Sequence, residues 1–432
     1  MVTVDAVRCA YCGGCVSVCP VDAIHLAETR LIIRETCIEC GLCVPACPVG
    51  ALSVEEADEF GRVGERITDR YDLIVVGAGP GGSTAAWQAA ELGLTTLLLE
   101  KRQEIGSPVR CAEGVSHESL VDFLEPDLAW ISARVARAQI IARANGQVVE
   151  RWQGSGGQGY VLERRVFDRS LAERAAQAGA QVRVKMAVTG LLYENGVVKG
   201  VLAEWQGEPI EIEARVVIAA DGVESRVGTW AGLDTRLPLE DAMACAQYLL
   251  AGIDWDPACL GYWIDEEVAP GGYAWVFPKG EGRANVGLGV QADLAEETAL
   301  AYLNRFIERE PALACSSPVT LVVGNVPAAL PCRRLVVDGL MLVGDAARQV
   351  DPLTGGGIIN AMTAGRLAAQ AAAAALAAGD TSARGLAVYQ EQAERLMGRR
   401  LTRNYRLRGR FPPGQRASRN FVRLFAMAAG GK

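Results

Sequence analysis

Two runs of four cysteines near the beginning of the chain constrain its fold more than any other feature. Each run reads C-x-x-C-x-x-C-x-x-x-C-P, and the second repeats the first 28 residues later. The cysteines are Cys9, Cys12, Cys15 and Cys19 in the first run, and Cys37, Cys40, Cys43 and Cys47 in the second. A disulfide scaffold would be a short secreted chain with its cysteines spread throughout. In a chain of 432 residues, this duplication predicts a metal-binding module that works in a reducing compartment.

The spacing resembles that of bacterial-type ferredoxins, in which the fourth cysteine of each run binds the cluster of the other run. The resemblance implies two [4Fe-4S] clusters within residues 1–57. One would be held by Cys9, Cys12, Cys15 and Cys47, and the other by Cys37, Cys40, Cys43 and Cys19. Structural zinc is the alternative for C-x-x-C pairs, but zinc sites do not use a duplicated run of four that ends in proline. Residues 58–70 are polar, and we expect them to be a linker.

The next segment carries a dinucleotide-binding pattern. A buried strand at 72–77 leads into Gly77-Ala-Gly79-Pro-Gly81-Gly82, followed by a helical pattern at 83–92 and a strand at 95–99. Glycines at these positions let the backbone approach a pyrophosphate at the N-terminus of the helix. Glu100, at the end of the second strand, would accept a hydrogen bond from the adenosine ribose. Lys101 and Arg102 leave NADP open as an alternative at this point.

Three later segments resemble flavoenzymes of the p-hydroxybenzoate-hydroxylase type and favour FAD. They are R-x-x-F-D at 164–168, D-G at 221–222 and G-D at 344–345. The resemblance implies that Asp345 binds ribityl or ribose hydroxyls, and that a helix beginning near Ile358 points its N–H groups at the flavin. The FAD-binding residues implied are Gly77, Gly79, Gly81, Gly82, Glu100, Lys101, Arg110, Arg164, Asp221, Gly222, Gly344, Asp345, Pro352, Gly355, Gly356 and Gly357.

A sheet of a second kind is predicted between residues 237 and 323, where apolar residues alternate, with a contribution from 135–160. Within it, residues 270–278 read P-x-x-Y-x-W-x-F-P, which looks like the signature of the geranylgeranyl reductase family of flavoenzymes. Tyr273, Trp275 and Phe277 would share one face of a strand. The resemblance implies an aromatic wall for an isoprenoid chain, while packing in the sheet core is the alternative. Flavin halogenases carry W-x-W-x-I-P, without this tyrosine and phenylalanine.

Cys111 follows the second nucleotide-binding strand, where members of that family place an active-site cysteine over the flavin. We expect it to take part in proton delivery, and an inert buried thiol is the alternative. The predicted fold is mixed α/β and α+β. A ferredoxin-like module precedes a Rossmann-like FAD domain built from 71–236 and 324–394, beside an antiparallel substrate domain at 237–323.

The C-terminal segment, 395–432, carries ten arginines and one lysine and no acidic residue, although the whole chain has a formal charge of −8. The overall charge argues against a nucleic-acid partner. The segment predicts contact with an anionic membrane or with a substrate phosphate, and a solvated segment that pairs with the acidic body is the alternative. The sequence shows no signal peptide and no membrane-spanning run. We therefore expect a cytoplasmic protein that can contact the inner face of the membrane.

Together these features predict a reductase that saturates isoprenoid C=C bonds by hydride transfer from reduced FAD. The substrate would be an isoprenoid lipid or a prenyl diphosphate. The ferredoxin module would supply electrons from an external low-potential donor, a ferredoxin or a flavodoxin, and its two clusters match the two electrons of one double bond. A ferredoxin- or flavoprotein-linked quinone oxidoreductase is the main alternative. An FAD monooxygenase is disfavoured, because oxygen damages exposed clusters.

Overall fold

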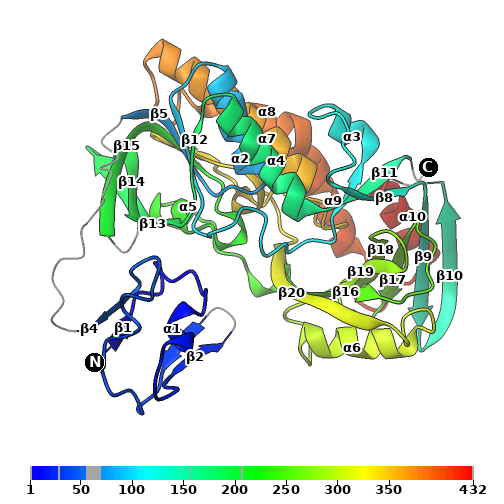
Figure 1. The fold of residues 1–432 in the computed structure, drawn as a ribbon. Helices are drawn as coiled ribbons and strands as arrows, with labels where there is room; N and C mark the ends of the chain where they lie inside the picture. Colours follow the sequence, from blue (N-terminus) through cyan, green and yellow to red (C-terminus); the bar gives the residue numbers. More distant parts are fainter. Residues whose placement is uncertain (1, 28–29, 55–69, 156, 206–207, 431–432) are drawn as a thin grey trace.

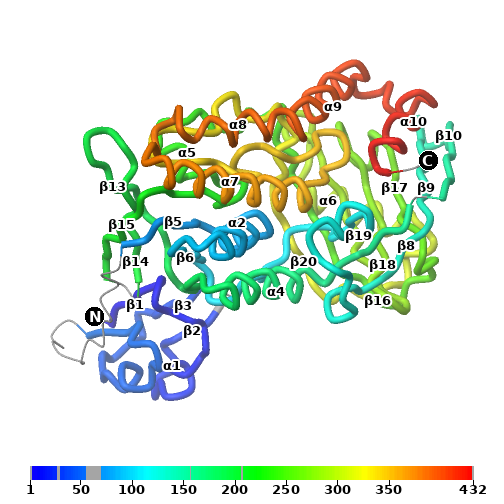
Figure 2. The backbone as a smooth tube through the Cα atoms, turned by 90° about the horizontal axis from the view of Figure 1, so that it is seen from above, coloured from blue at the N-terminus to red at the C-terminus, as the bar shows by residue number. Residues whose placement is uncertain are grey.

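The computed structural model describes residues 2–27, 30–54, 70–155, 157–205 and 208–430. The predicted linker, apart from Arg70, lies outside the described residues. A small ferredoxin module lies beside a long body in which the FAD module and the substrate sheet are neighbours (Figures 1 and 2). The mixed α/β and α+β architecture predicted from the sequence is confirmed.

The ferredoxin module is built from two antiparallel strand pairs. Strand β1 (Val2–Val4) pairs with β4 (Leu52–Val54), and β2 (Ile24–Ala27) pairs with β3 (Arg30–Ile33), while α1 (Gly14–Ser17) lies in the first cysteine run. The buried apolar core consists of Val2, Cys15, Ile24, Cys43 and Leu52. So small a core contributes little folding free energy, and two of its members are predicted cluster ligands. Cluster binding by these cysteines would therefore add to the stability of the folded module.

The FAD module has a parallel sheet packed against a layer of helices. Strands β12 (Gln181–Arg183), β6 (Thr96–Leu99), β5 (Tyr71–Val76), β15 (Glu208–Ala219) and β22 (Leu340–Leu342) run parallel in this order. These strands are apolar along much of their length, because they are buried in the core of the module. The helices are α2 (Pro80–Glu91), α4 (Arg164–Gln177) and α7 (Ile358–Ala378). Helix α2 begins three residues before the predicted start, because proline is well accommodated in the first turn.

An antiparallel extension and a small connecting sheet complete this half of the body. Strands β14 (Val197–Trp205) and β13 (Met186–Glu194) continue from β15 as a meander. A separate three-stranded sheet has the order β7 (Gly114–Ser116), β11 (Gly159–Leu162), β8 (Ile131–Val135). This small sheet carries the chain from the nucleotide-binding strands to the substrate sheet.

The substrate sheet has seven strands in the order β10-β9-β17-β18-β19-β16-β20. Their bounds are β9 (Arg137–Ala144), β10 (Gln147–Gly154), β16 (Ala242–Ala251), β17 (Cys259–Asp265), β18 (Tyr273–Pro278), β19 (Arg283–Gln291) and β20 (Ser317–Pro327). Strand β20 ends four residues beyond the expected boundary at 323. Helix α6 (Ala299–Arg309) covers one face, where Phe306 packs edge-on against Trp263. The other face borders the FAD module.

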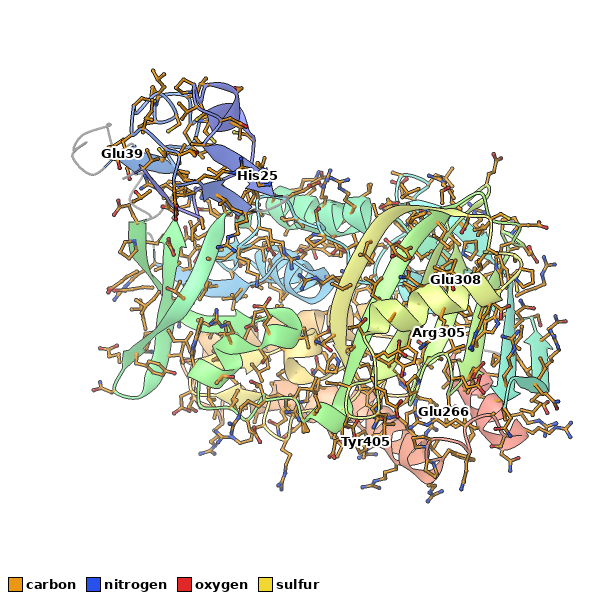
Figure 3. All side chains as sticks on the ribbon, turned by 90° about the horizontal axis from the view of Figure 1, so that it is seen from below. His25, Glu39, Glu266, Arg305, Glu308 and Tyr405 are labelled. Atoms are coloured by element: carbon orange, nitrogen blue, oxygen red, sulfur yellow. The ribbon has the colours of Figure 1, made fainter. Side chains whose placement is uncertain are left out.

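The C-terminal segment forms two packed helices, α9 (Arg399–Arg410) and α10 (Arg419–Ala428), and is not a solvated tail. Arg408 and Arg416 are buried and donate to the main-chain carbonyls of Ala328 and Gly271. The ferredoxin module and α9 lie on opposite sides of the FAD module, as His25 and Tyr405 show in Figure 3. In the described part of the chain, we find no helix of the length and hydrophobicity that a membrane crossing requires.

Candidate functional site

A single cavity of about 1480 Å³ runs between the FAD module and the substrate sheet. Every residue predicted as FAD-binding or catalytic lines it. Ligand pockets for small molecules usually measure about 300–1,000 Å³, so this cavity can hold a dinucleotide and part of a second ligand. The nucleotide-binding glycines and Glu100 line one part, and the aromatic residues of β18 line another.

The residues at the nucleotide end fit a bound pyrophosphate and ribose. Gly77 has a φ of 101°, and a side chain on it would meet the carbonyl oxygen of Ala220 at 2.4 Å. Gly79 faces open space, so a phosphate group can approach its backbone at the N-terminus of α2. The Glu100 carboxylate accepts hydrogen bonds from the N–H groups of Ala78 (3.1 Å) and Arg102 (3.0 Å). Its position beside the cleft is therefore fixed.

Two predicted basic residues have other contacts in this structure. Lys101 forms an ion pair with Glu224 at 2.6 Å, so the carboxylate of Glu224 balances the charge of the lysine. Arg110 lines the cavity with its side chain against Gly324 of β20.

The loop before α7 is anchored from three directions. The Asp351 carboxylate accepts from the N–H groups of Leu353 and Thr354 on one oxygen, and from Asn404 (2.7 Å) and Arg400 (3.1 Å) of α9 on the other. The Tyr273 hydroxyl of β18 donates to the carbonyl of Thr354 at 2.5 Å. Gly355, Gly356 and Gly357 follow directly and line the cavity. The α9 contribution to this loop is absent from the sequence prediction.

Two acidic residues of the flavin motifs face the cavity with oxygen available for a ligand. Burial raises the pKa of both Asp221 and Asp345 above the usual aspartate value. Asp221 Oδ1 is buried and accepts no hydrogen bond from the described residues. A buried acceptor without a partner is costly, so a hydroxyl of a bound cofactor would satisfy it. Together with the glycine backbone, these groups fit FAD.

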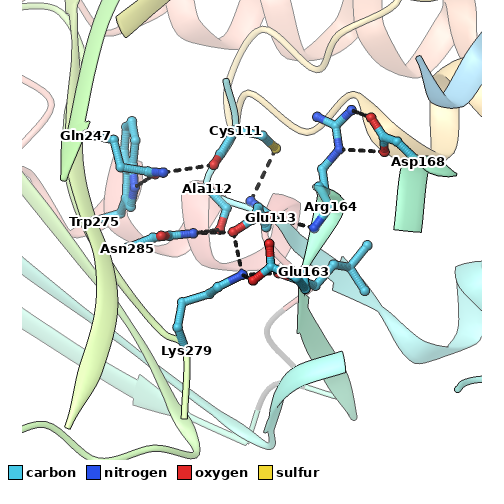
Figure 4. Close-up of polar contacts among 11 residues, drawn as sticks. Cys111, Ala112, Glu113, Glu163, Arg164, Asp168, Gln247, Trp275, Lys279 and Asn285 are labelled. Atoms are coloured by element: carbon cyan, nitrogen blue, oxygen red, sulfur yellow. Dashed lines mark hydrogen bonds and ion pairs between the residues drawn. The ribbon is translucent and has the colours of Figure 1, made fainter. Parts of the chain in front are cut away.

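Cys111 lies where the FAD-binding cleft meets the aromatic part of the cavity. Its sulfur accepts from the N–H of Glu113 at 3.2 Å, and its carbonyl accepts from Gln247 Nε2 at 3.0 Å (Figure 4). Gln247 Oε1 in turn accepts from the indole of Trp275 at 2.9 Å. Burial raises the pKa of the Cys111 thiol, although the guanidinium of Arg164 acts in the opposite direction. The thiol is therefore protonated at neutral pH, as a proton donor must be.

Arg164, predicted to bind FAD, makes a two-contact ion pair with Asp168 at 3.1 and 2.7 Å. Both residues are at the start of α4, and both line the cavity. The pair fixes the orientation of the Arg164 guanidinium, which lies close enough to Cys111 to act on the pKa of its thiol (Figure 4). Arg164 and Asp168 are the first and the last residue of the R-x-x-F-D motif.

A buried ion pair below Cys111 joins the cysteine loop to the substrate sheet. Lys279 Nζ lies 2.7 Å from Glu113 Oε2, and these residues are only 5% and 3% exposed. Asn285 donates to the same carboxylate oxygen at 2.5 Å, and the backbone N–H of Arg164 donates to Oε1 at 2.8 Å. Glu113 itself has a φ of 74°, a conformation that costs a non-glycine residue of order 1–3 kcal/mol. The network holds this loop conformation.

No motif in the sequence predicts this network. Two of its residues could have been suspected from their positions, because Glu113 is two residues after Cys111 and Lys279 directly follows the P-x-x-Y-x-W-x-F-P segment. Asn285 is in the middle of an otherwise apolar strand.

The aromatic wall includes more residues than the sequence motif. Tyr273, Trp275 and Phe277 line the cavity as expected, and Tyr262 of β17 joins them. The ring of Phe425 in α10 lies 5.0 Å from that of Tyr273 and 5.4 Å from that of Tyr262, centroid to centroid. The C-terminal helix therefore closes the apolar part of the cavity.

Cys245 on β16 also lines the cavity, although no motif marks it. Burial raises its pKa to about 12, so it is a neutral thiol. It lies close enough to Cys111 for the two to influence each other's ionisation.

The cysteines of the ferredoxin module are grouped as the ferredoxin resemblance implies. Cys9, Cys12, Cys15 and Cys47 line a small shared cavity. Cys43 interacts with Cys37, Cys40 and Cys19. The N–H groups of Ala23 and Ala51 donate to the sulfurs of Cys19 and Cys47, each at 3.2 Å, in matching positions of the duplication. Such N–H···S bonds tune cluster potentials.

Among the described residues, no three candidate ligands lie close enough to share one metal ion. Backbone N–H groups, that of Val21 first, also lower the pKa of Cys19 and favour the thiolate that iron binds.

Family models match all three parts of the chain. A 4Fe-4S binding domain matches residues 2–25 and 31–53, an FAD dependent oxidoreductase domain matches 72–280, and a geranylgeranyl reductase catalytic domain matches 241–326. Fold and site therefore define an FAD-dependent oxidoreductase fused to a ferredoxin module, with FAD and two [4Fe-4S] clusters as cofactors.

Its relatives define the family. The chain is 52% identical to the digeranylgeranylglycerophospholipid reductase of Methanosarcina acetivorans over 319 residues, 73% of this chain and 78% of the relative. The enzyme of the same name from Methanothrix thermoacetophila is 51% identical over 341 residues, which make up 78% of this chain and 87% of that relative. This chain belongs to the digeranylgeranylglycerophospholipid reductase family, and the resemblance predicted from the motifs is confirmed.

Solved structures support the assignment. A geranylgeranyl bacteriochlorophyll reductase-like protein from Thermoplasma acidophilum is 42% identical, with a TM-score of 0.75 over 79% of this chain and 87% of that one. A flavin-dependent brominase, 17% identical with a TM-score of 0.64, shares the fold alone.

Replacing Lys279 with methionine leaves the buried Glu113 carboxylate without its counter-charge. We expect the free energy of unfolding to fall by about 3–5 kcal/mol, the usual cost of breaking a buried pair from one side. Urea denaturation of the FAD-loaded protein measures this change. The double variant K279M/E113Q removes both charges and leaves one acceptor oxygen for the N–H of Arg164, so it should recover part of the loss. A loss below about 1 kcal/mol in K279M would contradict the network's anchoring role.

Proposed function

We propose that this protein saturates the C=C bonds of geranylgeranyl chains carried by a glycerophospholipid. The observation that carries the proposal is the continuity of the FAD-binding cleft with an aromatic-walled cavity, with Cys111 at their junction. The names of its relatives support the choice of lipid. An apolar chain without hydrogen-bonding groups is bound by apolar and aromatic side chains, as this wall provides.

Saturation of one double bond adds two electrons and two hydrogens. Reduced FAD, when bound, supplies a hydride to one alkene carbon. The other carbon needs a proton, and the protonated thiol of Cys111 can hold that proton at the junction. The faces of Tyr273, Trp275 and Phe277 would stabilise positive charge that develops on the alkene. The same rings exclude water from the reacting carbons.

The electrons would come from an external low-potential carrier, a ferredoxin or a flavodoxin, through the clusters of the ferredoxin module. Each cluster carries one electron at a time, and two such electrons reduce one FAD. This route supports the proposal because the chain carries its own cluster module beside its FAD module.

A mass-spectrometric assay tests the reaction. The anaerobic protein, reduced with dithionite, is incubated with digeranylgeranylglycerophospholipid. Products should be heavier by two mass units for each bond reduced. A quinone oxidoreductase would instead leave the lipid mass unchanged and reduce an added quinone rapidly. That pair of results would overturn the proposal.

Replacing Cys111 with serine should slow reoxidation of the reduced flavin by the lipid at least tenfold, because a hydroxyl is a much weaker acid than the thiol. FAD content and the rate of flavin reduction should stay at the wild-type level. Single-turnover absorbance measurements follow both steps. Cys315, which is exposed and remote from the cavity, gives the control variant C315S. An unchanged rate of lipid-dependent reoxidation in C111S would remove the thiol from the mechanism.

We also propose that α9 and α10 contact an anionic membrane, where such a lipid resides. Arg399, Arg406, Arg410 and Arg423 are exposed on these helices, and no ion pair joins them to another described residue. Helix α10 closes the apolar cavity, so contact there brings lipid chains to its wall.

Replacing Arg406, Arg410 and Arg423 with glutamine should weaken binding to vesicles that contain anionic lipid. At about 1 kcal/mol per basic residue, the partition coefficient should fall on the order of 100-fold, measured by vesicle sedimentation. Exposed Arg30, Arg334 and Arg384, replaced together, give a control with the same change in charge. Equal binding by the two triple variants would argue against a role for these helices.

A further inference from the structure

One lysine of the FAD module makes the shortest contacts with the ferredoxin module. Lys185 Nζ donates to the carbonyl of Val7 at 2.6 Å and to that of Cys9 at 2.8 Å. It also lies 5.8 Å from the centre of the Tyr11 ring. An ion pair between Arg8 and Glu208, at 3.5 Å, lies on the same interface. In Figures 1 and 2, the module rests against the end of the body that carries β13 and β14.

Lys185 is held rigidly at the edge of the FAD-binding cleft. Its φ of 58° is in the left-handed region, which is uncommon for a residue with a side chain. Its N–H donates to the carbonyl of Arg102, and the N–H of Met186 donates to the carbonyl of Glu100, each at 3.0 Å. The backbone that presents the ammonium group is thus bonded to the strand end that carries the ribose-binding acid.

The contacts between described residues of the two modules lie around the first cysteine run. Among the described residues, the polar contacts between the modules come from Val7, Arg8, Cys9 and Tyr11, around the first ligand of the first run. Val7 also lines the main cavity together with the FAD-binding residues. Around the second run, Ile38 and Leu42 are 60% and 52% exposed, while the matching cysteines Cys12 and Cys40 are exposed in both runs.

We propose that electrons cross this module in one direction, from the cluster of Cys37, Cys40, Cys43 and Cys19 to the cluster of Cys9, Cys12, Cys15 and Cys47, and then to FAD. In this arrangement Lys185 is the positioning residue for the last step. This inference rests on the proposed electron supply, and it does not depend on the identity of the lipid.

The electron balance is simple. We call the cluster of Cys37, Cys40, Cys43 and Cys19 the outer cluster and that of Cys9, Cys12, Cys15 and Cys47 the inner cluster. An external low-potential one-electron carrier is oxidised and reduces the outer cluster, which passes its electron to the inner cluster. Two electrons delivered singly by the inner cluster, with protons from solvent, reduce one FAD. Each delivery returns the inner cluster to its oxidised form.

The Lys185 charge should also affect one cluster more than the other. A reduced cluster carries one more negative charge than the oxidised form, so a nearby ammonium group favours reduction. Lys185 contacts the backbone of a ligand to the inner cluster. Its loss should therefore lower the potential of that cluster and leave the outer one nearly unchanged.

The variant Lys185→Met tests the inference without any lipid. The anaerobic holoprotein is mixed with a purified, reduced 2[4Fe-4S] ferredoxin, and stopped-flow absorbance follows clusters and flavin separately. We expect cluster reduction at the wild-type rate and flavin reduction at least tenfold slower. Redox titration by electron paramagnetic resonance should show a lower potential for one cluster only.

Two further variants complete the design. Lys185→Arg keeps the charge and the donors and should restore most of the rate, whereas K199M removes a lysine from the neighbouring strand β14 and should behave as wild type. Full signals from both clusters in K185M show that the module is folded. Wild-type flavin reduction in K185M, or equal shifts of both potentials, would overturn the inference. Because no lipid is present, either result leaves the proposed reaction to be judged on its own assay.

Discussion

The ion pair between Glu113 and Lys279 holds together a site that two separate modules build. Glu113 belongs to the loop of Cys111, and Lys279 ends the strand that carries the aromatic wall. Burying both charges is costly unless each is fully hydrogen-bonded, and Asn285 and the backbone of Arg164 complete the partners of the carboxylate. The pair fixes the spacing between thiol, flavin cleft and aromatic rings together with two hydrogen bonds that also join the modules, from Gln247 to the Cys111 carbonyl and from Tyr273 to the Thr354 carbonyl.

The parts of the molecule that could be predicted from sequence have local causes. The glycine turn after β5, the strand motif of Tyr273, Trp275 and Phe277, and the two cysteine runs each place their chemistry within one short segment. The partners of these segments come from elsewhere in the chain: Gln247 for the Cys111 loop, Asn404 for Asp351, and Phe425 for the wall. A single sequence without structure gives no means of pairing residues that are far apart in the chain, here by 53 positions for Asn404 with Asp351 and by 136 for Gln247 with Cys111.

The basic C-terminal segment was also only partly predictable. Its ten arginines predict an exposed basic surface, but the sequence does not show which arginines face solvent and which are buried. Arg408 and Arg416 are buried, and their guanidinium groups satisfy main-chain carbonyls that would otherwise lack donors. Lys185 is a related case, since a lone lysine at a strand end has no pattern, and its importance is visible only when two backbone carbonyls of another module are seen to converge on it.

The placement of the ferredoxin module and α9 on opposite sides of the FAD module has a kinetic consequence. By the membrane contact proposed for α10, a lipid chain would enter without obstructing the proposed path by which electrons return to the flavin. The cofactor can therefore be recharged while a partly saturated chain stays in place. A chain with several double bonds could then slide along the aromatic wall and be reduced repeatedly in one binding event, so the product distribution would reflect processivity and not the affinity of each intermediate.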